Sequence, residues 1–261
     1  MLGLGTSVTS IDSGQIYQEL SELGSYASLT LHFDFSTLSG ISGSEVTAAT
    51  NLGGGGSAFN IGTNSETPLL DRNGFGGRSS VIFDGSDEFL VMGREFTSTN
   101  KSFTFFVVLQ RHDLSNDYAV AGSGEEEITD SIRFTGTGES IQTIMASQTA
   151  VTTTLASTGG STVDYTQVAG VPSVLVMRRN TSGEMYIYAD NGIYIGAKTN
   201  TAIKAAVRFS LLTIGGTGAE GAADFTGQIG EVGMYDADIG DAAAITLSKE
   251  LSTKWGVNRR S

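Results

Sequence analysis

The sequence predicts an all-β protein folded as a β-sandwich, and three observations support this prediction. Many short segments rich in Val, Ile, Phe and Thr follow one another at near-regular spacing, as the strands of a sandwich do. The chain has 35 glycines but only 2 prolines, which suits tight turns with positive φ between short strands. Hydrophobic residues make up 39% of the 261 residues, enough for a large single core.

Residues 1–27 are expected to form an N-terminal arm and a short helix ahead of the sandwich domain. Residues 1–10 are uncharged and include several apolar side chains, so they are either a frayed terminus or an arm that orders against a neighbouring subunit. Asp12 can cap a helix that stops at Gly24. Its apolar stripe is formed by Ile16, Leu20 and Leu23.

Residues 28–261 are expected to form one sandwich domain. Residues 29–35 alternate apolar and polar side chains, which predicts a half-buried strand with His32 on its polar face. Residues 102–109 are apolar throughout, as in a central strand covered on both faces. Further strands are predicted near Val46 and at 58–61, 81–83, 89–92, 118–121, 131–134, 141–145, 150–155, 173–179, 184–189, 207–214 and 225–235.

The end of the chain predicts an amphipathic helix over residues 240–254. Asp238 or Asp241 near its start would favour the positive end of the helix dipole. Its apolar stripe is formed by Ala244, Leu247, Leu251 and Trp255. Trp255, the single tryptophan, is therefore predicted to anchor the helix on the sandwich and not to serve as a platform for a sugar.

Two motifs resemble the LamG-like family of concanavalin A-type jelly rolls. Residues 83–90, FDGSDEFL, are similar to a hairpin that begins the sandwich in that family. The second motif is a strand of the form FxGxIxEVxxY that leads into a helix ending in KWG, matched here by Phe225, Gly227, Ile229, Glu231, Val232, Tyr235, Lys254, Trp255 and Gly256. The resemblance covers roughly residues 29–257 and implies a jelly-roll sandwich. It does not specify a ligand, because this fold carries many functions.

Charge and cysteine content argue against several classes of function. The net charge of −13 opposes binding to nucleic acid, whose phosphates would be repelled. With no cysteine, the chain has neither disulfides nor thiolate metal sites. The first residues lack the basic and apolar regions of a signal peptide, and no stretch reaches the ~20 apolar residues of a membrane span. We therefore expect synthesis in the host cytoplasm.

The sequence predicts no catalytic residues. Jelly-roll glucan hydrolases carry an E-x-D-x-x-E strand, and that spacing does not occur here. The acidic cluster at 125–130 would point to opposite faces of a strand and is interpreted as a solvated turn. His32 and His112 are the two histidines, and no nucleophile-elbow motif accompanies them. The glycine run at 53–56 lacks the strand-to-helix context of a phosphate-binding loop.

The sequence predicts no cofactor and no bound metal, with calcium as the alternative. LamG-like domains often hold Ca²⁺ through loop carboxylates and carbonyls, so the resemblance implies two candidate turns. Calcium needs six to eight oxygen ligands, however, and acidic residues are common in ordinary turns. The candidates are Asp84, Asp87 and Glu88 in one turn and Asp190 with Asn191 in another.

The sequence does not identify the residues of a ligand site. A sugar site would need exposed aromatic side chains near polar groups, although buried tyrosines of the core would give the same pattern. The candidates at strand ends or in loops are Tyr118, Tyr165 and Tyr194.

The leading hypothesis is a non-catalytic structural protein of a tailed-phage virion, decorating the capsid or forming part of the tail or fibre. The opening MLGLGTS also resembles virion proteins of marine tailed phages. The expected partners are other virion proteins and copies of itself, both bound through the arm. This hypothesis also includes lectin-like adhesion to cell-surface glycans. The alternative is a bacterial carbohydrate-binding module or adhesin domain. A glycoside hydrolase, the third hypothesis, would lack its carboxylates.

Overall fold

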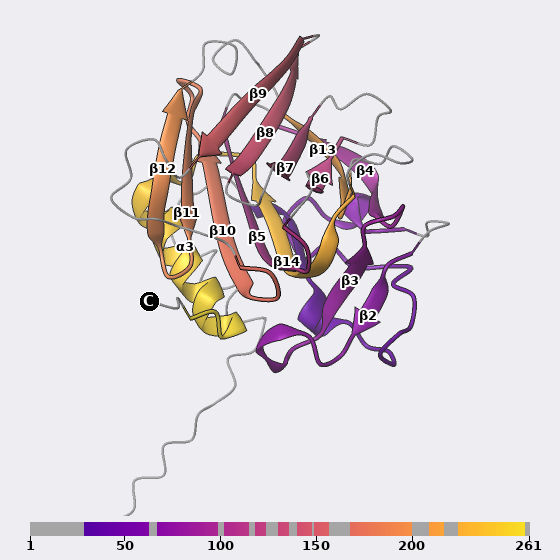
Figure 1. Ribbon diagram of the computed structural model, residues 1–261. Coiled ribbons are helices and arrows are strands. Elements are labelled where there is room, and N and C mark those ends of the chain that lie inside the picture. The colour runs from indigo at the N-terminus through magenta and orange to yellow at the C-terminus, as the bar shows by residue number, and fades with distance from the viewer. Residues whose placement is uncertain are drawn as a thin grey trace, which may run out of the picture.

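The computed structural model is a two-layer β-sandwich with a helix against its larger sheet (Figure 1). It describes residues 29–62, 67–98, 102–114, 118–123, 130–135, 140–147, 149–156, 168–199, 209–216 and 224–258. The predicted β-sandwich with a C-terminal helix is confirmed. The predicted arm and helix at 1–27 lie outside the described residues, so the boundary at residue 27 stays a prediction.

Each sheet is antiparallel throughout its described strands. The larger runs in the order β12 (Ile193–Thr199), β11 (Glu184–Ala189), β10 (Pro172–Arg179), β5 (Phe103–Arg111), β14 (Thr226–Tyr235), β3 (Ser80–Asp84) and β2 (Leu69–Asp71), with β1 (Leu29–Asp34) also paired to β14. The smaller runs in the order β4 (Leu90–Thr97), β13 (Ser210–Ile214), β6 (Tyr118–Gly122), β7 (Ser131–Thr135), β8 (Ser140–Ser147) and β9 (Thr149–Ala156).

Strand β14 lies at the centre of the larger sheet. One of its edges pairs with β5, while the other pairs first with β3 and then with β1. This arrangement places Glu231 in the middle of the sheet, opposite Asp34 of β1. A side chain at Gly230 would collide with the indole of Trp255, so glycine at this position lets the helix approach the sheet.

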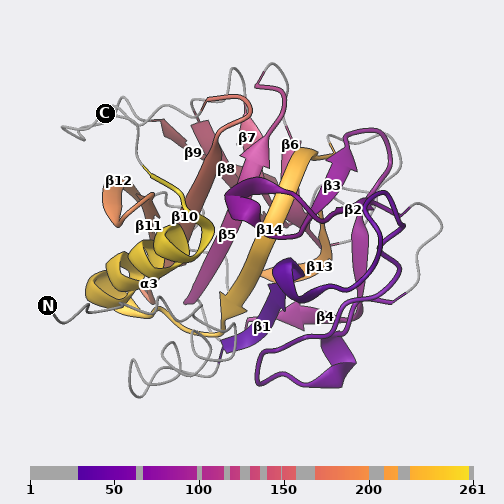
Figure 2. The ribbon, with the colours of Figure 1, turned by 90° about the horizontal axis from the view of Figure 1, so that it is seen from below.

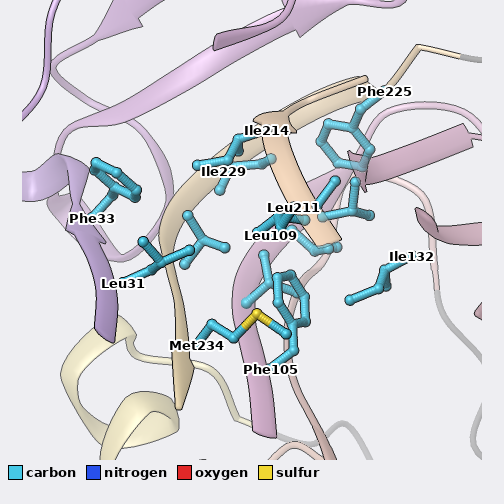
Figure 3. Packing of buried hydrophobic residues seen from close by; sticks show 14 of the residues in the cluster. Leu31, Phe33, Phe105, Leu109, Ile132, Leu211, Ile214, Phe225, Ile229 and Met234 are labelled. Atoms are coloured by element: carbon cyan, nitrogen blue, oxygen red, sulfur yellow. The ribbon is translucent and has the colours of Figure 1, made fainter. Parts of the chain in front are cut away.

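Two hydrophobic layers cover the two faces of β5. In the layer between the sheets, Phe105 and Leu109 pack with residues of both sheets (Figure 3). On the other face, Phe106 and Val108 pack beneath the C-terminal helix. The prediction that this strand is buried on both faces is confirmed. A small void lies between the sheets and is lined by Phe105 and Ile132. Its volume is about 10 Å³, which leaves room for one water molecule at most, so this void is not a ligand site.

The helix α3 (Gly240–Trp255) crosses the outer face of the larger sheet, beside β10 and β11 (Figure 2). The predicted helix over 240–254 is thus confirmed. It ends at Gly256, whose left-handed φ of 63° suits glycine and whose N–H donates to carbonyls of the last turn. Trp255 is fully buried, as predicted for an anchor. Among the described residues, no helix has the length and apolar character needed to cross a membrane.

The first predicted strand is only partly correct. Strand β1 ends at Asp34, which caps a 3-10 helix at Phe35–Thr37. The predicted polar face is wrong, because His32 is 1% exposed and Asp34 is buried as well. The reason is that the C-terminal end of α3, distant in sequence, supplies Lys254 to cover this face.

Two further expectations are corrected, and two strands were missed. In place of a strand at 58–61, Ser57–Phe59 forms a 3-10 helix, and the pairing around residues 45–61 consists of isolated bridges. The segment 83–90 is not a hairpin, because β3 and β4 belong to different sheets and the turn crosses between them. The short strands β2 and β12 were not predicted.

The β10–β11 hairpin, in contrast, is confirmed. The tight turn expected after it has positive φ at Asn191 (57°) and Gly192 (78°) and leads into β12.

Candidate functional site

A buried cluster of charged side chains fastens the C-terminal end of α3 to the sheet. It consists of His32, Asp34, Glu231, Lys254 and Trp255, and we call it the buried cluster. The carboxylate of Glu231 lies 2.7 Å from His32 Nε2 and accepts hydrogen bonds of 2.7 Å from both Lys254 Nζ and Trp255 Nε1. Lys254 Nζ also donates to Asp34 Oδ2 at 2.8 Å.

The surroundings of Glu231 keep it ionised. Burial would raise the pKa of Glu231, but the hydrogen bond from His32 and the charge of Lys254 lower it to about 2. The side chains of Glu231 and Asp34 are 0% exposed, and those of Lys254 and His32 are 1% exposed. No ligand can reach these groups, so the buried cluster has a structural role.

A second cluster lies at the opposite end of α3 and reaches the surface. We call it the tyrosine patch, and it consists of Arg178, Tyr186, Tyr188, Tyr194, Asp238 and Asp241. Strand alternation explains its position. Met185 and Ile187 of β11 point into the core between the sheets, whereas Tyr186 and Tyr188 lie on the outer face of the larger sheet. Tyr194 on β12 stands beside them, with its ring centroid 5.6 Å from that of Tyr188.

Arg178 is the fixed centre of the tyrosine patch. Its guanidinium lies 3.8 Å from the ring centroid of Tyr186 and pairs with Asp238 at 2.9 Å. It also pairs with Asp241. Burial would lower the pKa of Arg178, but Tyr188 and Asp238 raise it overall. With its side chain only 6% exposed, this cation positions neighbouring groups and is hardly open to a ligand.

The open part of the tyrosine patch is an aromatic ring beside a carboxylate. The Tyr188 hydroxyl donates to Asp241, and this bond is the main reason why the pKa of Asp241 is lowered. Burial and the same bond raise the pKa of Tyr188 to about 12. At neutral pH, Asp241 is therefore a carboxylate and Tyr188 a hydroxyl. The Asp241 side chain is 63% exposed and Tyr194 is 43% exposed.

This combination suits the recognition of a hydroxyl-rich ligand. A tyrosine ring offers a flat apolar surface with a polar tip, and a carboxylate accepts hydrogen bonds from hydroxyl groups. A small number of polar groups beside an aromatic surface can fix the orientation of a small ligand.

Carboxylates of the acidic turns singled out as calcium candidates accept hydrogen bonds from backbone N–H groups. Glu88 accepts the N–H of Asp84 at 2.7 Å, and Asp84 accepts the N–H of Ser86 at 2.8 Å. In the second turn, Asp190 accepts the N–H of Val174 at 2.7 Å. In the part of the chain that the structure describes, no three His, Cys, Asp or Glu side chains are grouped to hold a metal ion.

The remaining sequence candidates do not converge on one site. Residues 125–129 and Tyr165 lie outside the described residues, as does the side chain of Tyr118. Asp130, the last acid of the predicted turn, is buried and accepts the N–H of Ser210 at 2.6 Å. Tyr194 is thus the one predicted aromatic candidate whose exposure the structure establishes.

No family model and no curated protein matches this sequence. The chain is similar in structure to the binding domain of Paraclostridial Mosquitocidal Protein 1, with a TM-score of 0.60, 12% identity and coverage of 88% of this chain and 55% of that one. The binding domain of botulinum neurotoxin serotype G gives a TM-score of 0.59, 10% identity and coverage of 86% and 51%. The structure of Trypanosoma rangeli sialidase in complex with sialic acid gives a TM-score of 0.56 and 12% identity. The match covers 92% of this chain and 39% of that one.

At these identities the likeness concerns the fold. The chain spans about half the length of the toxin binding domains it matches. The expected β-sandwich of the jelly-roll kind agrees with these matches, whereas the LamG-like resemblance stays a prediction.

Proposed function

We propose that this protein is a non-catalytic, lectin-like recognition domain that binds carbohydrate through the tyrosine patch. The observation that carries the proposal is the exposed ring of Tyr194 beside the exposed carboxylate of Asp241, both set on a rigid base of Arg178 and Tyr188. A site of this kind works best when its side chains are held by their neighbours before the ligand arrives.

The similar solved structures add support, because two of those named above are binding domains of toxins. This favours a binding role over a purely structural role. The fold alone does not decide the function, since sandwiches of this kind carry many activities. The proposal therefore depends on the tyrosine patch.

The state of the carboxylates near Tyr194 supports a non-catalytic role. Glycoside hydrolysis requires a carboxylic acid with a raised pKa to protonate the leaving oxygen, usually opposite a second carboxylate. Asp241 has the reverse property, a lowered pKa, and Asp238 is paired with Arg178. With this lowered pKa, Asp241 is suited to accept hydrogen bonds and poorly suited to donate a proton.

The place of this domain in a tailed-phage virion stays a prediction, as do its virion partners. It can be tested by deleting residues 1–27 and measuring incorporation into particles. The hypothesis expects the truncated protein to stay folded and soluble but to be lost from particles. Normal incorporation would contradict attachment through the arm.

The binding proposal is tested with a glycan array probed by the purified protein and by Tyr194→Ala. Wild-type protein should bind a defined group of glycans, and Tyr194→Ala should lose that binding while keeping its circular dichroism spectrum. Ile41→Ala is the matched control, because Ile41 is a 79% exposed apolar side chain outside the patch. Absence of glycan binding, or equal binding by Tyr194→Ala, would overturn the proposal.

A further inference from the structure

The charges of the tyrosine patch are unequal in number. The guanidinium of Arg178 faces the carboxylates of Asp238 and Asp241. With one guanidinium facing two carboxylates, the side chains of the tyrosine patch carry a net negative charge.

The charges are also unequal in their access to solvent. Arg178 is 6% exposed at its side chain, whereas Asp241 is 63% exposed. A ligand that approaches Tyr194 therefore meets the carboxylate before the guanidinium. Burial raises the pKa of Tyr194, the nearby charge of Asp241 raises it further, and the charge of Arg178 opposes this rise.

The positive end of the α3 dipole does not reverse this balance. A helix N-terminus attracts anions through its free N–H groups. Here Asp238 already accepts the N–H of Gly240 at 2.9 Å, and Asp241 occupies the first turn. The protein's own carboxylates thus take the place that an anionic ligand would use.

We propose that the ligand of the tyrosine patch is an uncharged sugar, and that Asp241 excludes acidic sugars. This inference rests on the proposed function and specifies its ligand class. The apolar face of a neutral pyranose stacks on Tyr194, and its hydroxyl groups donate to Asp241. The carboxylate of an acidic sugar would face Asp241 at close range and be repelled. The net charge of −13 acts in the same direction at longer range.

The test compares neutral oligosaccharides with matched acidic counterparts that differ by one sialic or uronic acid. Isothermal titration with wild-type protein should give at least about tenfold tighter binding for the neutral member, as expected for a like-charge contact close to the surface. Asp241→Asn keeps the size of the side chain but removes its charge. In this variant the preference for the neutral member should shrink toward equality.

Lys249 provides the control for an alternative source of charge. It is exposed on α3 and lies next to Gly192, so its positive charge would attract an acidic sugar. Lys249→Met should leave the neutral preference unchanged.

Each outcome separates the two proposals. Tighter binding of the acidic member would overturn this inference while leaving carbohydrate recognition intact. An unchanged preference in Asp241→Asn would show that another group selects the ligand. A protein that binds neither member of any pair, in agreement with a negative glycan array, would overturn the proposed function itself.

Discussion

The two ends of α3 carry clusters of similar composition but opposite access to solvent. Each combines carboxylates, a basic side chain and an aromatic ring. At the C-terminal end, Glu231, Lys254 and Trp255 are all buried, so none of the three is open to water. At the N-terminal end, Asp241 and Tyr194 are open because the helix begins there and β12 lies at the end of the described sheet order. Exposure therefore decides which cluster can recognise a ligand.

The same difference decides what each cluster contributes to stability. Removing one partner from a buried charge network leaves another charge unpaired in a dry environment, which is costly. Near the surface, water screens the charges and a pair contributes little. Mutations in the two clusters should therefore have unequal effects on unfolding.

The largest effect is expected from Glu231→Ala. This change leaves Lys254 and His32 without their shared carboxylate, and it should lower the free energy of unfolding by about 3–5 kcal/mol. Urea denaturation followed by circular dichroism measures it. Asp241→Ala is the matched change in the tyrosine patch and should cost less than about 1 kcal/mol. Equal losses for the two variants would refute the comparison.

Truncating the anchor of the buried cluster should have a similar effect. Trp255 packs on Phe75, with ring centroids 5.0 Å apart, and lies over Gly230. Trp255→Ala should cost ~3–5 kcal/mol, as truncation of large aromatic side chains in cores does. Thermal unfolding measures this loss. Because Trp255 is the single tryptophan, native fluorescence offers an independent check, and an emission maximum typical of an exposed indole would contradict its burial.

The next largest effect is expected from acid, which should reduce the contribution of the buried cluster to the free energy of unfolding. The folded-state pKa of Glu231 is about 2, below its ordinary value of 4.5, so the unfolded chain takes up the proton first as the pH falls. The stabilisation is complete above about pH 5 and is lost between about pH 4.5 and pH 2, a loss on the order of 3 kcal/mol. Urea titrations at several pH values measure it. Glu231→Gln should remove this part of the pH dependence, and an unchanged profile would assign it to other carboxylates.

Much of the fold could be predicted because its signals are local. The continuous apolar run of β5, the hairpin of β10 and β11, and the periodicity of α3 each lie within one segment. The burial of His32 could not be predicted, because its partner Glu231 lies 199 residues away in the sequence. In the sequence it looks like the polar side of an alternating strand.

The candidate site could be predicted only in part, for the same reason. Tyr194 was a candidate by residue type, but its exposure depends on how β12 lies at the end of the sheet. Arg178 meets Asp238 and Asp241 across about 60 residues, and no spacing in the sequence signals that contact. The alternation of Tyr186 and Tyr188 in β11 is the one local sign that aromatic rings share an outer face.

The smallest effect on stability is expected from Tyr194→Ala. This variant is also the sharpest test of the tyrosine patch. Tyr194 is 43% exposed and its described ring contact is with Tyr188, so the free energy of unfolding should fall by about 1 kcal/mol or less. Sugar binding should nevertheless weaken by at least about tenfold, since the stacking surface is lost. Tyr194→Phe keeps the ring and should retain most of the affinity. If Tyr194→Ala instead destabilised the protein as strongly as Trp255→Ala, its ring would be a second structural anchor, and the contrast between the two ends of α3 would fail.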